Sequence, residues 1–253
     1  MTDLQGYADA LTAARRELRA VPPLTDSFPE LDQATAYRVQ RLQRSAAGPL
    51  AGWKLGVTSR AKQKQVNIDA PVYGYLAASD ALDLGEPLVV AQQIQPRAEP
   101  EIVLVMGRDL AGTHVTAADV LAATSHVAVG IEVLDSRYEN YRFTIPDVVA
   151  DNTSAGRYVV GTPVPAAGID LRLVGVVLEH NGEVFGTASG AASLGHPAAA
   201  VAWMVRALAE HGEGLEAGQI VLSGGLTAAA PVRAGDVVVA SIDRLGSVEL
   251  ACV

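Results

Sequence analysis

The stretch IQPRAEPEIVLVMG, residues 94–107, begins with charged residues and continues as an apolar run. Its β-branched and aliphatic residues are typical of a buried β-strand. Residues two apart in a strand face the same side, so Arg97, Glu99 and Glu101 share one face. Pro100 cannot donate a hydrogen bond to a neighbouring strand, which predicts a sheet edge, a bulge or the start of the strand. Two carboxylates held this close repel each other unless a proton or a cation lies between them.

A third carboxylate interrupts the next strongly apolar stretch, HVAVGIEVLD, residues 126–135. A glutamate inside a buried strand, as Glu132 would be, is costly without a partner. If the two strands pair, Glu99, Glu101 and Glu132 form an all-oxygen site, and hard oxygen ligands favour Mg²⁺ or Mn²⁺ over zinc. The residues leave a second interpretation open, in which these acids lie on a solvated sheet face and pair with neighbouring arginines.

The first part of the chain has helical patterning. Apolar residues recur at helical spacing over 3–20, and Asp32 is a suitable N-cap for a second helix that continues to about Ser45. The link between them, residues 21–30, holds three prolines and cannot continue either helix. We therefore predict an N-terminal helical region over residues 1–47.

Residues 48–253 change to short apolar strands separated by glycine and proline. Strands are predicted at 51–57, 101–107, 126–135, 218–225, 235–242 and 246–253, a hairpin at 171–190 around Asn181-Gly182, and helices at 59–66, 117–124 and 196–212. Strands and helices do not alternate regularly, which argues against a doubly wound parallel sheet. The pattern predicts an α+β fold in which a mixed or mostly antiparallel β core carries peripheral helices.

Composition and charge exclude several classes of function. The formal net charge of −9 argues against a sequence-independent grip on nucleic acid and against an anionic membrane surface as a partner. The single cysteine, Cys252, cannot form an intramolecular disulfide or a zinc cluster of thiolates. No window approaches the roughly 18 to 20 apolar residues of a membrane-spanning helix, and the first residues do not resemble a secretion signal. We expect a soluble protein of the reducing cytoplasm.

Seven segments occur in an order that resembles a known family. They are GWKLGVTS, PRAEPEI, IEVLDSRY, VADNTSAGRYVVG, GAASLGHPAAAVAW, VLSGGLTAAAPVRAGD and LGSVEL. From about residue 3 to its C-terminus the chain is similar to the hydratase and decarboxylase group of the fumarylacetoacetate hydrolase superfamily, which acts in meta-cleavage pathways that degrade aromatic compounds. The resemblance implies a mixed β-roll with an N-terminal helical region. It also implies a divalent metal, usually Mg²⁺, held by the glutamates that match Glu99, Glu101 and Glu132.

Two activities within this group need to be separated. One subgroup hydrates 2-hydroxypenta-2,4-dienoate, and the other decarboxylates 2-oxohex-3-enedioate to that dienoate and CO₂. The hydratases carry an aspartate in a Pro-Asp-Phe-Gly-like loop, whereas the matching segment here, APVYG, has Val72. Valine cannot manage the proton of an added water, so the resemblance favours the decarboxylase, with the hydratase as the alternative. Hydrolases of the superfamily use a histidine on an N-terminal loop, and here no histidine precedes His114.

The resemblance also implies roles for individual residues. Lys54, in GWKLGVTS, matches the family's active-site lysine, and its ammonium would hold a substrate carboxylate or donate a proton to the departing carbanion. Ser154, in ADNTSAG, is the next catalytic candidate, as a hydrogen-bond donor beside the metal or the substrate. From residue type alone, Lys54 would be a lysine that extends along an edge strand to solvent, and Ser154 would be a turn former.

Four further residues are candidates for binding the substrate. Arg137 and Arg142 can each grip the distal carboxylate with two hydrogen bonds, although a solvated position is an alternative for Arg142. Asp151 would fix the loop beside the substrate. Thr227 would touch the substrate from the glycine-rich segment 223–231.

The implied ligands are small. We expect a 2-oxo dicarboxylate substrate and Mg²⁺ or Mn²⁺, with no nucleic acid and no membrane. Members of the family are oligomers, and the decarboxylases associate with their hydratases, so we expect a homo-oligomer and consider a complex with the pathway hydratase. A non-catalytic scaffold in such a complex is the alternative outside enzyme function.

Overall fold

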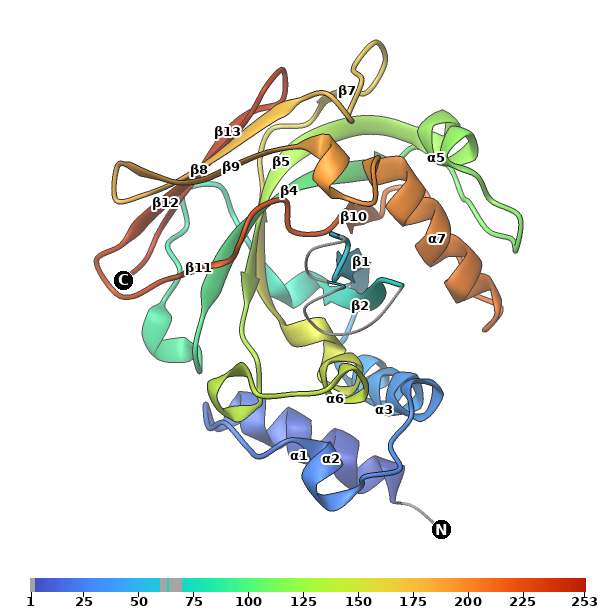
Figure 1. Ribbon diagram of the computed structural model, residues 1–253, viewed down its shortest axis with the longest axis vertical. Helices are drawn as coiled ribbons and strands as arrows, with labels where there is room; N and C mark the ends of the chain where they lie inside the picture. Colours follow the sequence, from blue (N-terminus) through green and yellow to red (C-terminus); the bar gives the residue numbers. More distant parts are fainter. Residues whose placement is uncertain (1–2, 60–62, 64–69) are drawn as a thin grey trace.

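The computed structural model describes residues 3–59, 63 and 70–253. Three helices open the chain and lie together at one end of the molecule, beside a fourth helix from later in the sequence (Figure 1). They are α1 (Leu4–Arg16), α2 (Leu24–Ser27) and α3 (Gln33–Ala46), and the later helix is α6 (Ile145–Ala150). Asp3 and Asp32 cap α1 and α3 by accepting backbone N–H groups of the first turn. Helix α1 ends before the expected residue 20 because Leu18 adopts a left-handed φ of 52°.

The main sheet has nine strands and is mixed. Its order is β2-β1-β10-β4-β5-β6-β3, with β11 paired to β4 and β7 paired to β5. The strands are β1 (Leu50–Gly56), β2 (Val72–Ala77), β3 (Ala81–Leu82), β4 (Arg97–Met106), β5 (Thr124–Leu134), β6 (Ala155–Val160), β7 (Val164–Pro165), β10 (Ile220–Leu222) and β11 (Ala230–Pro231). The pairs β1–β10 and β3–β6 are parallel and the other pairs are antiparallel. The predicted α+β fold with a mixed β core is confirmed.

A second sheet of four antiparallel strands packs against β4, β5 and β6. Its order is β13-β12-β8-β9, with β8 (Gly175–His180), β9 (Glu183–Ser189), β12 (Val237–Ile242) and β13 (Gly246–Ala251). Asn181 and Gly182 both have positive φ, at 55° and 80°, which is the geometry of a tight hairpin turn. The predicted hairpin is confirmed.

Two helices lie on the opposite side of the molecule from the second sheet (Figure 1). They are α5 (Ala117–Ala123) and α7 (Pro197–Ala209), and they pack against each other. Thr116 and Asp119 form a capping box at the start of α5. His196 caps α7, because its Nδ1 accepts the N–H of Ala198 at 3.0 Å. Both helices agree with the sequence pattern.

The main sheet buries different kinds of residue on its two faces. Lys54 is in register with Leu222, which is in register with Val103, so these side chains share one face. The apolar cluster on this face is small; its buried members are Leu76, Val103, Ala128, Tyr158 and Leu222. The other face joins the large core beneath the helices and the second sheet, through residues such as Trp53 and Leu104. The face with the small cluster therefore leaves room for polar side chains.

Pro100 does not mark a sheet edge. It is the fourth residue of β4, which lies inside the sheet between β10 and β5. Its carbonyl accepts the N–H of Leu226, so its nitrogen faces the same segment, 223–229, which separates β10 from β11. A proline is tolerated there because no strand requires a donor at that point. The alternative of a position near the start of a strand is the one that fits.

Several elements differ from the sequence prediction. Strands β2 and β6 and helix α6 were not expected, and Val72 begins β2 instead of lying in a loop. The helix expected at 59–66 lies almost wholly outside the described residues. The division into residues 1–47 and 48–253 stays a prediction. Within the described ranges, no helix is long and apolar enough to cross a membrane.

Candidate metal and active site

Three glutamates meet on the face of the main sheet that carries the small apolar cluster. The register of β4 and β5 places Glu99 directly opposite Glu132, and Glu101 lies two residues farther along β4 on the same side. One carboxylate oxygen from each residue lies within 4.8 Å of the others. The exposed fractions of the three residues are 4%, 0% and 1% for Glu99, Glu101 and Glu132. The interpretation as a solvated sheet face is therefore wrong.

Two carboxylates of the cluster, those of Glu101 and Glu132, are incompletely satisfied by the described residues. Burial raises the pKa of Glu101 well above its ordinary value, and the carboxylates of Glu132 and Glu99 raise it further. Burial also raises the pKa of Glu132, while the ammonium of Lys54 opposes this. Glu101 Oε1 and Glu132 Oε2 are buried with no hydrogen-bond partner among the described residues. Oxygens in this state require protons or a cation.

The donor set fits a hard divalent ion. The cluster consists of carboxylates alone, with no histidine or cysteine in the group that the described residues form. Carboxylate oxygens are the ligands that Mg²⁺ and Mn²⁺ prefer in proteins. The residues present therefore agree with the cation that the sequence analysis expected.

Lys54 reaches this cluster from β1, on the same face of the curled sheet, although β1 is not adjacent to β5. Strand β1 is separated from β5 by β10 and β4, yet Lys54 Nζ lies 2.9 Å from Glu132 Oε1. Lys54 is 1% exposed, so it is neither on an edge strand nor extended to solvent. Its Nζ also donates to the carbonyl of Thr153 at 3.0 Å. The ammonium is paired with Glu132, while Glu101 Oε1 has no hydrogen-bond partner among the described residues, so the arrangement suits a dication.

The carbonyl that Lys54 contacts belongs to a strained turn. Asn152, Thr153 and Ser154 follow one another with φ of 49°, 54° and 56°, and all three are buried. A run of left-handed non-glycine residues costs free energy and persists only where neighbours hold it. The Asn152 side chain donates to and accepts from the backbone of Tyr75, and Thr153 Oγ1 donates to the carbonyl of Tyr73. Strand β2 thus locks the turn beside Lys54.

Arg137, Asp151 and Ser154 form a second buried group that holds the same turn. Arg137 donates from Nε to the Asp151 carboxylate and from Nη2 to the Asp151 carbonyl. Its Nη1 donates to the carbonyls of Asp135 and Ala155 at 2.7 Å each. Ser154 Oγ donates to Asp151 Oδ2 at 3.2 Å. Burial raises the pKa of Asp151 to about 6, against the lowering effect of Arg137.

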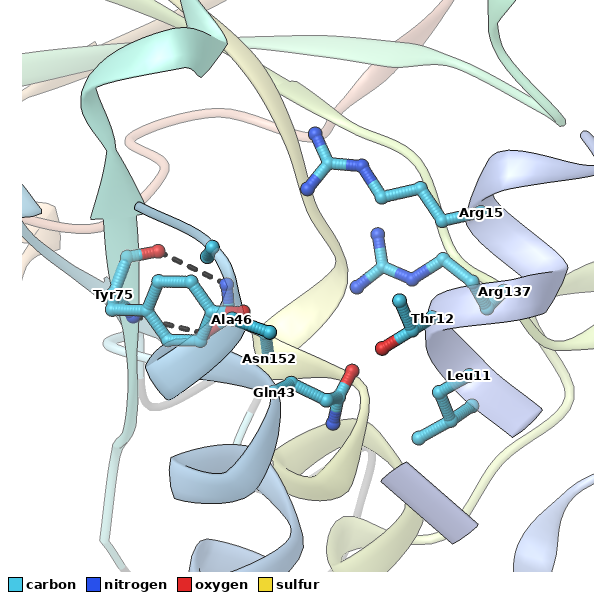
Figure 2. A pocket seen from close by; sticks show the side chains of 9 residues that line it. Leu11, Thr12, Arg15, Gln43, Ala46, Tyr75, Arg137 and Asn152 are labelled. Atoms are coloured by element: carbon cyan, nitrogen blue, oxygen red, sulfur yellow. Dashed lines mark hydrogen bonds between the residues drawn. The ribbon is translucent and has the colours of Figure 1, made fainter. Parts of the chain in front are cut away.

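The Arg137 guanidinium lies on the side of the turn that faces the N-terminal helices. It lines a cavity of about 120 Å³ together with Arg15 and Thr12 of α1, Gln43 of α3 and Asn152 (Figure 2). In Figure 2 the two guanidinium groups extend in parallel toward the part of the cavity between α1 and β2. Arg137 is thus engaged by the chain itself, behind the turn and not among the three glutamates.

The remaining two candidates lie apart from the glutamates. Arg142 is exposed and forms an ion pair with Asp26, with Nη2 2.7 Å from Oδ2. Thr227 is half-buried, and its hydroxyl donates to the carbonyl of Ala228 at 2.9 Å. None of the contacts described for either residue reaches Glu99, Glu101 or Glu132.

Two glycines that follow β10 pass directly against the carboxylates. Gly224 donates its N–H to Glu101 Oε2 at 2.6 Å. A Cβ on Gly225 would overlap the carboxylate of Glu99, and a Cβ on Gly224, where φ is 102°, would overlap Thr58. Glycine is required at both positions because side chains would fill the site. Backbone was expected near the substrate in segment 223–231, but Gly224, Gly225 and Thr58 were not identified individually. The only signal in the sequence is a glycine pair after a strand.

Comparison with known proteins agrees with this geometry. Residues 41–252 match the family model described as fumarylacetoacetate (FAA) hydrolase C-terminal. The chain is 40% identical to a 4-oxalocrotonate decarboxylase of Pseudomonas sp. (strain CF600), over 95% of this chain and 93% of the relative. It is 41% identical to the TodF product hydratase of Pseudomonas putida (strain F1), over 96% of this chain and 93% of the relative.

A solved structure extends the likeness to three dimensions. The 4-oxalocrotonate decarboxylase from Pseudomonas putida G7, complexed with magnesium and adipate, superimposes with a TM-score of 0.96 at 37% identity. The match covers 100% of this chain and 99% of that chain. The predicted resemblance is confirmed: the chain belongs to the fumarylacetoacetate hydrolase family.

Proposed function

We propose that this protein decarboxylates 2-oxohex-3-enedioate, also called 4-oxalocrotonate, to 2-hydroxypenta-2,4-dienoate and CO₂. The observation that carries the proposal is the cluster of three buried carboxylates opposite one buried ammonium. Glu99, Glu101 and Glu132 would hold Mg²⁺ or Mn²⁺. The relatives named 4-oxalocrotonate decarboxylase support the reaction, and so does the solved relative that holds magnesium and adipate, a dicarboxylate with the same chain length as the proposed substrate.

The substrate is suited to such a site because its 1-carboxylate and 2-oxo oxygens can bind one cation together. When bound, the divalent ion supplies Lewis-acid stabilisation of the negative charge that develops on the 2-oxo oxygen, which contributes several kcal/mol. In the reaction, the bond from C5 to the distal carboxylate breaks and CO₂ leaves. The electron pair moves through the alkene to the 2-oxo oxygen, and one proton then converts this dienolate into the hydroxydienoate, which keeps the 1-carboxylate.

Lys54 is the residue proposed to act on the reacting part of the substrate. Its buried ammonium would attract a carboxylate of the dianion, and it can donate the proton that the product requires. Ser154 Oγ donates within the turn to Asp151, so its proposed contribution is to keep the turn in place beside Lys54. Asp151 and Arg137 would act in the same way, as residues that position the turn. Direct contact of Arg137, Arg142 or Thr227 with the substrate stays a prediction.

Val72 supports decarboxylation over hydration. It is fully buried at the start of β2 and pairs with Gly56 of β1, two residues beyond Lys54 and on the same face. An apolar side chain therefore lies where hydratases of the group carry an aspartate, and it cannot take a proton from water. Hydration of 2-hydroxypenta-2,4-dienoate is the second candidate, because relatives named as hydratases are 40% and 41% identical to this chain.

The two candidates are separated by offering each substrate alone. The Mg²⁺-loaded protein is expected to release CO₂ from 2-oxohex-3-enedioate and to add no water to 2-hydroxypenta-2,4-dienoate. Both reactions are followed by ultraviolet absorbance, with CO₂ measured separately. Consumption of the dienoate without release of CO₂ from the first substrate would assign the protein to the hydratases.

Three further expectations belong to this proposal. The protein would act in the cytoplasm, as a homo-oligomer, and in association with a hydratase that consumes its product. Gel filtration with light scattering measures the oligomer, and co-purification with the pathway hydratase tests the complex. A stable monomer would contradict the expected homo-oligomer, and failure to bind the hydratase would contradict the expected complex. Neither result would change the proposed reaction.

A further inference from the structure

The hydroxyl of Thr58 is buried and has no role in the site as described above. Thr58 follows β1 and is 1% exposed. Its Oγ1 has no hydrogen-bond partner among residues 3–59, 63 and 70–253. Buried hydroxyl groups are almost always hydrogen-bonded, because losing water without a replacement partner is unfavourable. The described part of the chain supplies no partner, so a bound ligand is the candidate that we consider.

The backbone holds Thr58 in place against strain. Val57 has a left-handed φ of 56°, which is costly for a β-branched residue. Gln63 Nε2 donates to the carbonyl of Val57 at 3.0 Å, and the N–H of Leu194 donates to the carbonyl of Thr58 at 3.1 Å. Gln63, six residues farther on, and Leu194, from a distant segment, thus hold the backbone of Val57 and Thr58 in this conformation.

The position of Thr58 links it to the carboxylate cluster. A Cβ added to Gly224 would lie only 2.1 Å from Thr58 Oγ1, so the Thr58 side chain occupies the space beside this glycine. The N–H of Gly224 donates to Glu101 Oε2 at 2.6 Å. Thr58 and Glu101 therefore both lie against Gly224, which places the Thr58 hydroxyl one residue away from the carboxylate cluster.

We propose that Thr58 is a substrate-binding residue whose Oγ1–H donates a hydrogen bond to a carboxylate oxygen at the 2-oxo acid end of the substrate. A dianionic substrate offers only acceptors, which matches a hydroxyl that has its proton free. The Gly224 N–H cannot serve instead, because Glu101 already accepts it. This inference rests on the proposed function for the identity of the substrate, but the binding of a 2-oxo acid tests it without turnover.

The test uses the whole protein loaded with Mg²⁺ and titrated calorimetrically with 2-oxohexanedioate, a saturated analogue that keeps the 2-oxo acid end. Thr58→Val removes the hydroxyl at nearly constant shape and is expected to weaken binding about 10- to 100-fold, the loss of one hydrogen bond to a charged acceptor. Thr58→Ser restores the donor and is expected to bind within about threefold of the wild type. Titration with Mg²⁺ alone is expected to give the same affinity for all three proteins.

Thermal unfolding without ligand distinguishes binding from a structural role. Because the hydroxyl has no partner within the described residues, Thr58→Val is expected to unfold at the same temperature as the wild type or higher. The matched control is Thr25→Val, which removes a half-buried hydroxyl of α2 that donates to Asp147 Oδ2 at 2.7 Å. This control is expected to lower the unfolding temperature and to leave 2-oxohexanedioate binding unchanged.

Each outcome decides between the inference and the proposed function. Equal binding of 2-oxohexanedioate by wild type and Thr58→Val would overturn the inference, as would a parallel loss of Mg²⁺ affinity in that variant. A wild type that binds the analogue through Thr58 but releases no CO₂ from 2-oxohex-3-enedioate would overturn the proposed reaction and keep the inference. A wild type that does not bind the analogue would overturn the inference, while release of CO₂ from 2-oxohex-3-enedioate would still decide the proposed function.

Discussion

Two groups of buried charges lie on either side of the turn at residues 152–154, and they differ in how far the chain satisfies them. Arg137 and Asp151 are paired with each other, and the guanidinium also donates to three backbone carbonyls. Glu101 and Glu132 have only Lys54 as a cationic partner in the described part of the chain, and each keeps a buried oxygen without a donor. The first group is complete as folded, whereas the second requires a cation.

This difference distinguishes the buried charges that hold the fold from the buried charges that form the binding site. A buried ion pair is destabilising when one partner is missing, because the other charge is left without solvent or counter-charge. The chain completes the Arg137 group with its own atoms, so that group can hold the strained turn. It leaves the glutamates incomplete, which weakens the fold locally but prepares a binding site for positive charge. The following predictions test this contrast.

The largest expected effect is on activity after Glu101→Gln. Loss of one carboxylate from the cluster removes a ligand and a negative charge, so the rate of CO₂ release is expected to fall on the order of 10³-fold or more. The metal-free variant is expected to unfold at a higher temperature than the metal-free wild type, because repulsion within the cluster is relieved.

The matched control is Glu213→Gln. Glu213 is a partly buried glutamate that pairs with Arg44 away from the cluster, so its loss is expected to leave the rate unchanged. Retention of full activity by Glu101→Gln would contradict the metal site, and so would an equal loss of activity in both variants.

Lys54→Met is expected to affect both activity and stability. Removing the proposed proton donor is expected to slow CO₂ release about 10²- to 10⁴-fold. Removing the one cation beside Glu132 is also expected to destabilise the metal-free protein by about 3 kcal/mol in urea unfolding. Saturating Mg²⁺ is expected to recover part of that loss, because the ion supplies the missing positive charge. A loss of stability of the same size with and without Mg²⁺ would contradict the contrast drawn above.

Arg137→Met is expected to act mainly on stability, with any loss of activity following from displacement of the turn beside Lys54. It leaves Asp151 buried without its partner and frees the turn, so the free energy of unfolding is expected to fall by about 3–5 kcal/mol. Mg²⁺ is not expected to offset this loss, in contrast to Lys54→Met. The double variant with Asp151→Asn is expected to recover part of the stability, since it removes the unpaired charge. Direct binding of the substrate by Arg137 would appear instead as weakened binding of 2-oxohexanedioate in folded protein.

The smallest expected effect is a dependence of the metal-free protein on pH. The pKa of Glu101 in the folded protein lies well above the ordinary 4.5 of the unfolded chain, so the unfolded chain releases this proton first as pH rises. The stability that the protonated group contributes is full below pH 4.5 and is lost as pH rises through the folded pKa. In EDTA, the unfolding temperature of the wild type relative to Glu101→Gln is expected to fall from pH 5 to pH 8. With Mg²⁺ this fall is expected to disappear, and its persistence would argue that the ion does not bind there.

Most of the acidic and basic residues of the site could be identified from the sequence, but fewer of their positions relative to one another could be predicted. Alternation along 97–101 indicated that Glu99 and Glu101 share a face, and the apolar run around Glu132 indicated that it is buried. The register of β4 against β5 was open, because a shift of pairing by one residue would turn Glu132 to the other face. Strand β2 was missed because Gly74 interrupts a short apolar run, and glycine is unfavourable inside a strand.

Other features depend on contacts between residues far apart in the chain. Lys54 meets Glu132 only because the sheet curls until β1 and β5 approach across its interior. The left-handed run at 152–154 is held by Arg137 from one side and by β2 from the other. Asn, Thr and Ser in a row predict a turn, but its handedness is decided by these partners.

The sequence by itself determined which residues carry charge into apolar strands, because burial pattern and spacing are local properties of the chain. The tertiary structure alone decided that three of these charges share one site with the Lys54 ammonium, while Arg137 is enclosed behind the turn and Arg142 stays on the surface. The physical reason is that the free energy of a buried charge depends on what lies within a few ångströms of it, and those neighbours come from strands that are distant in sequence.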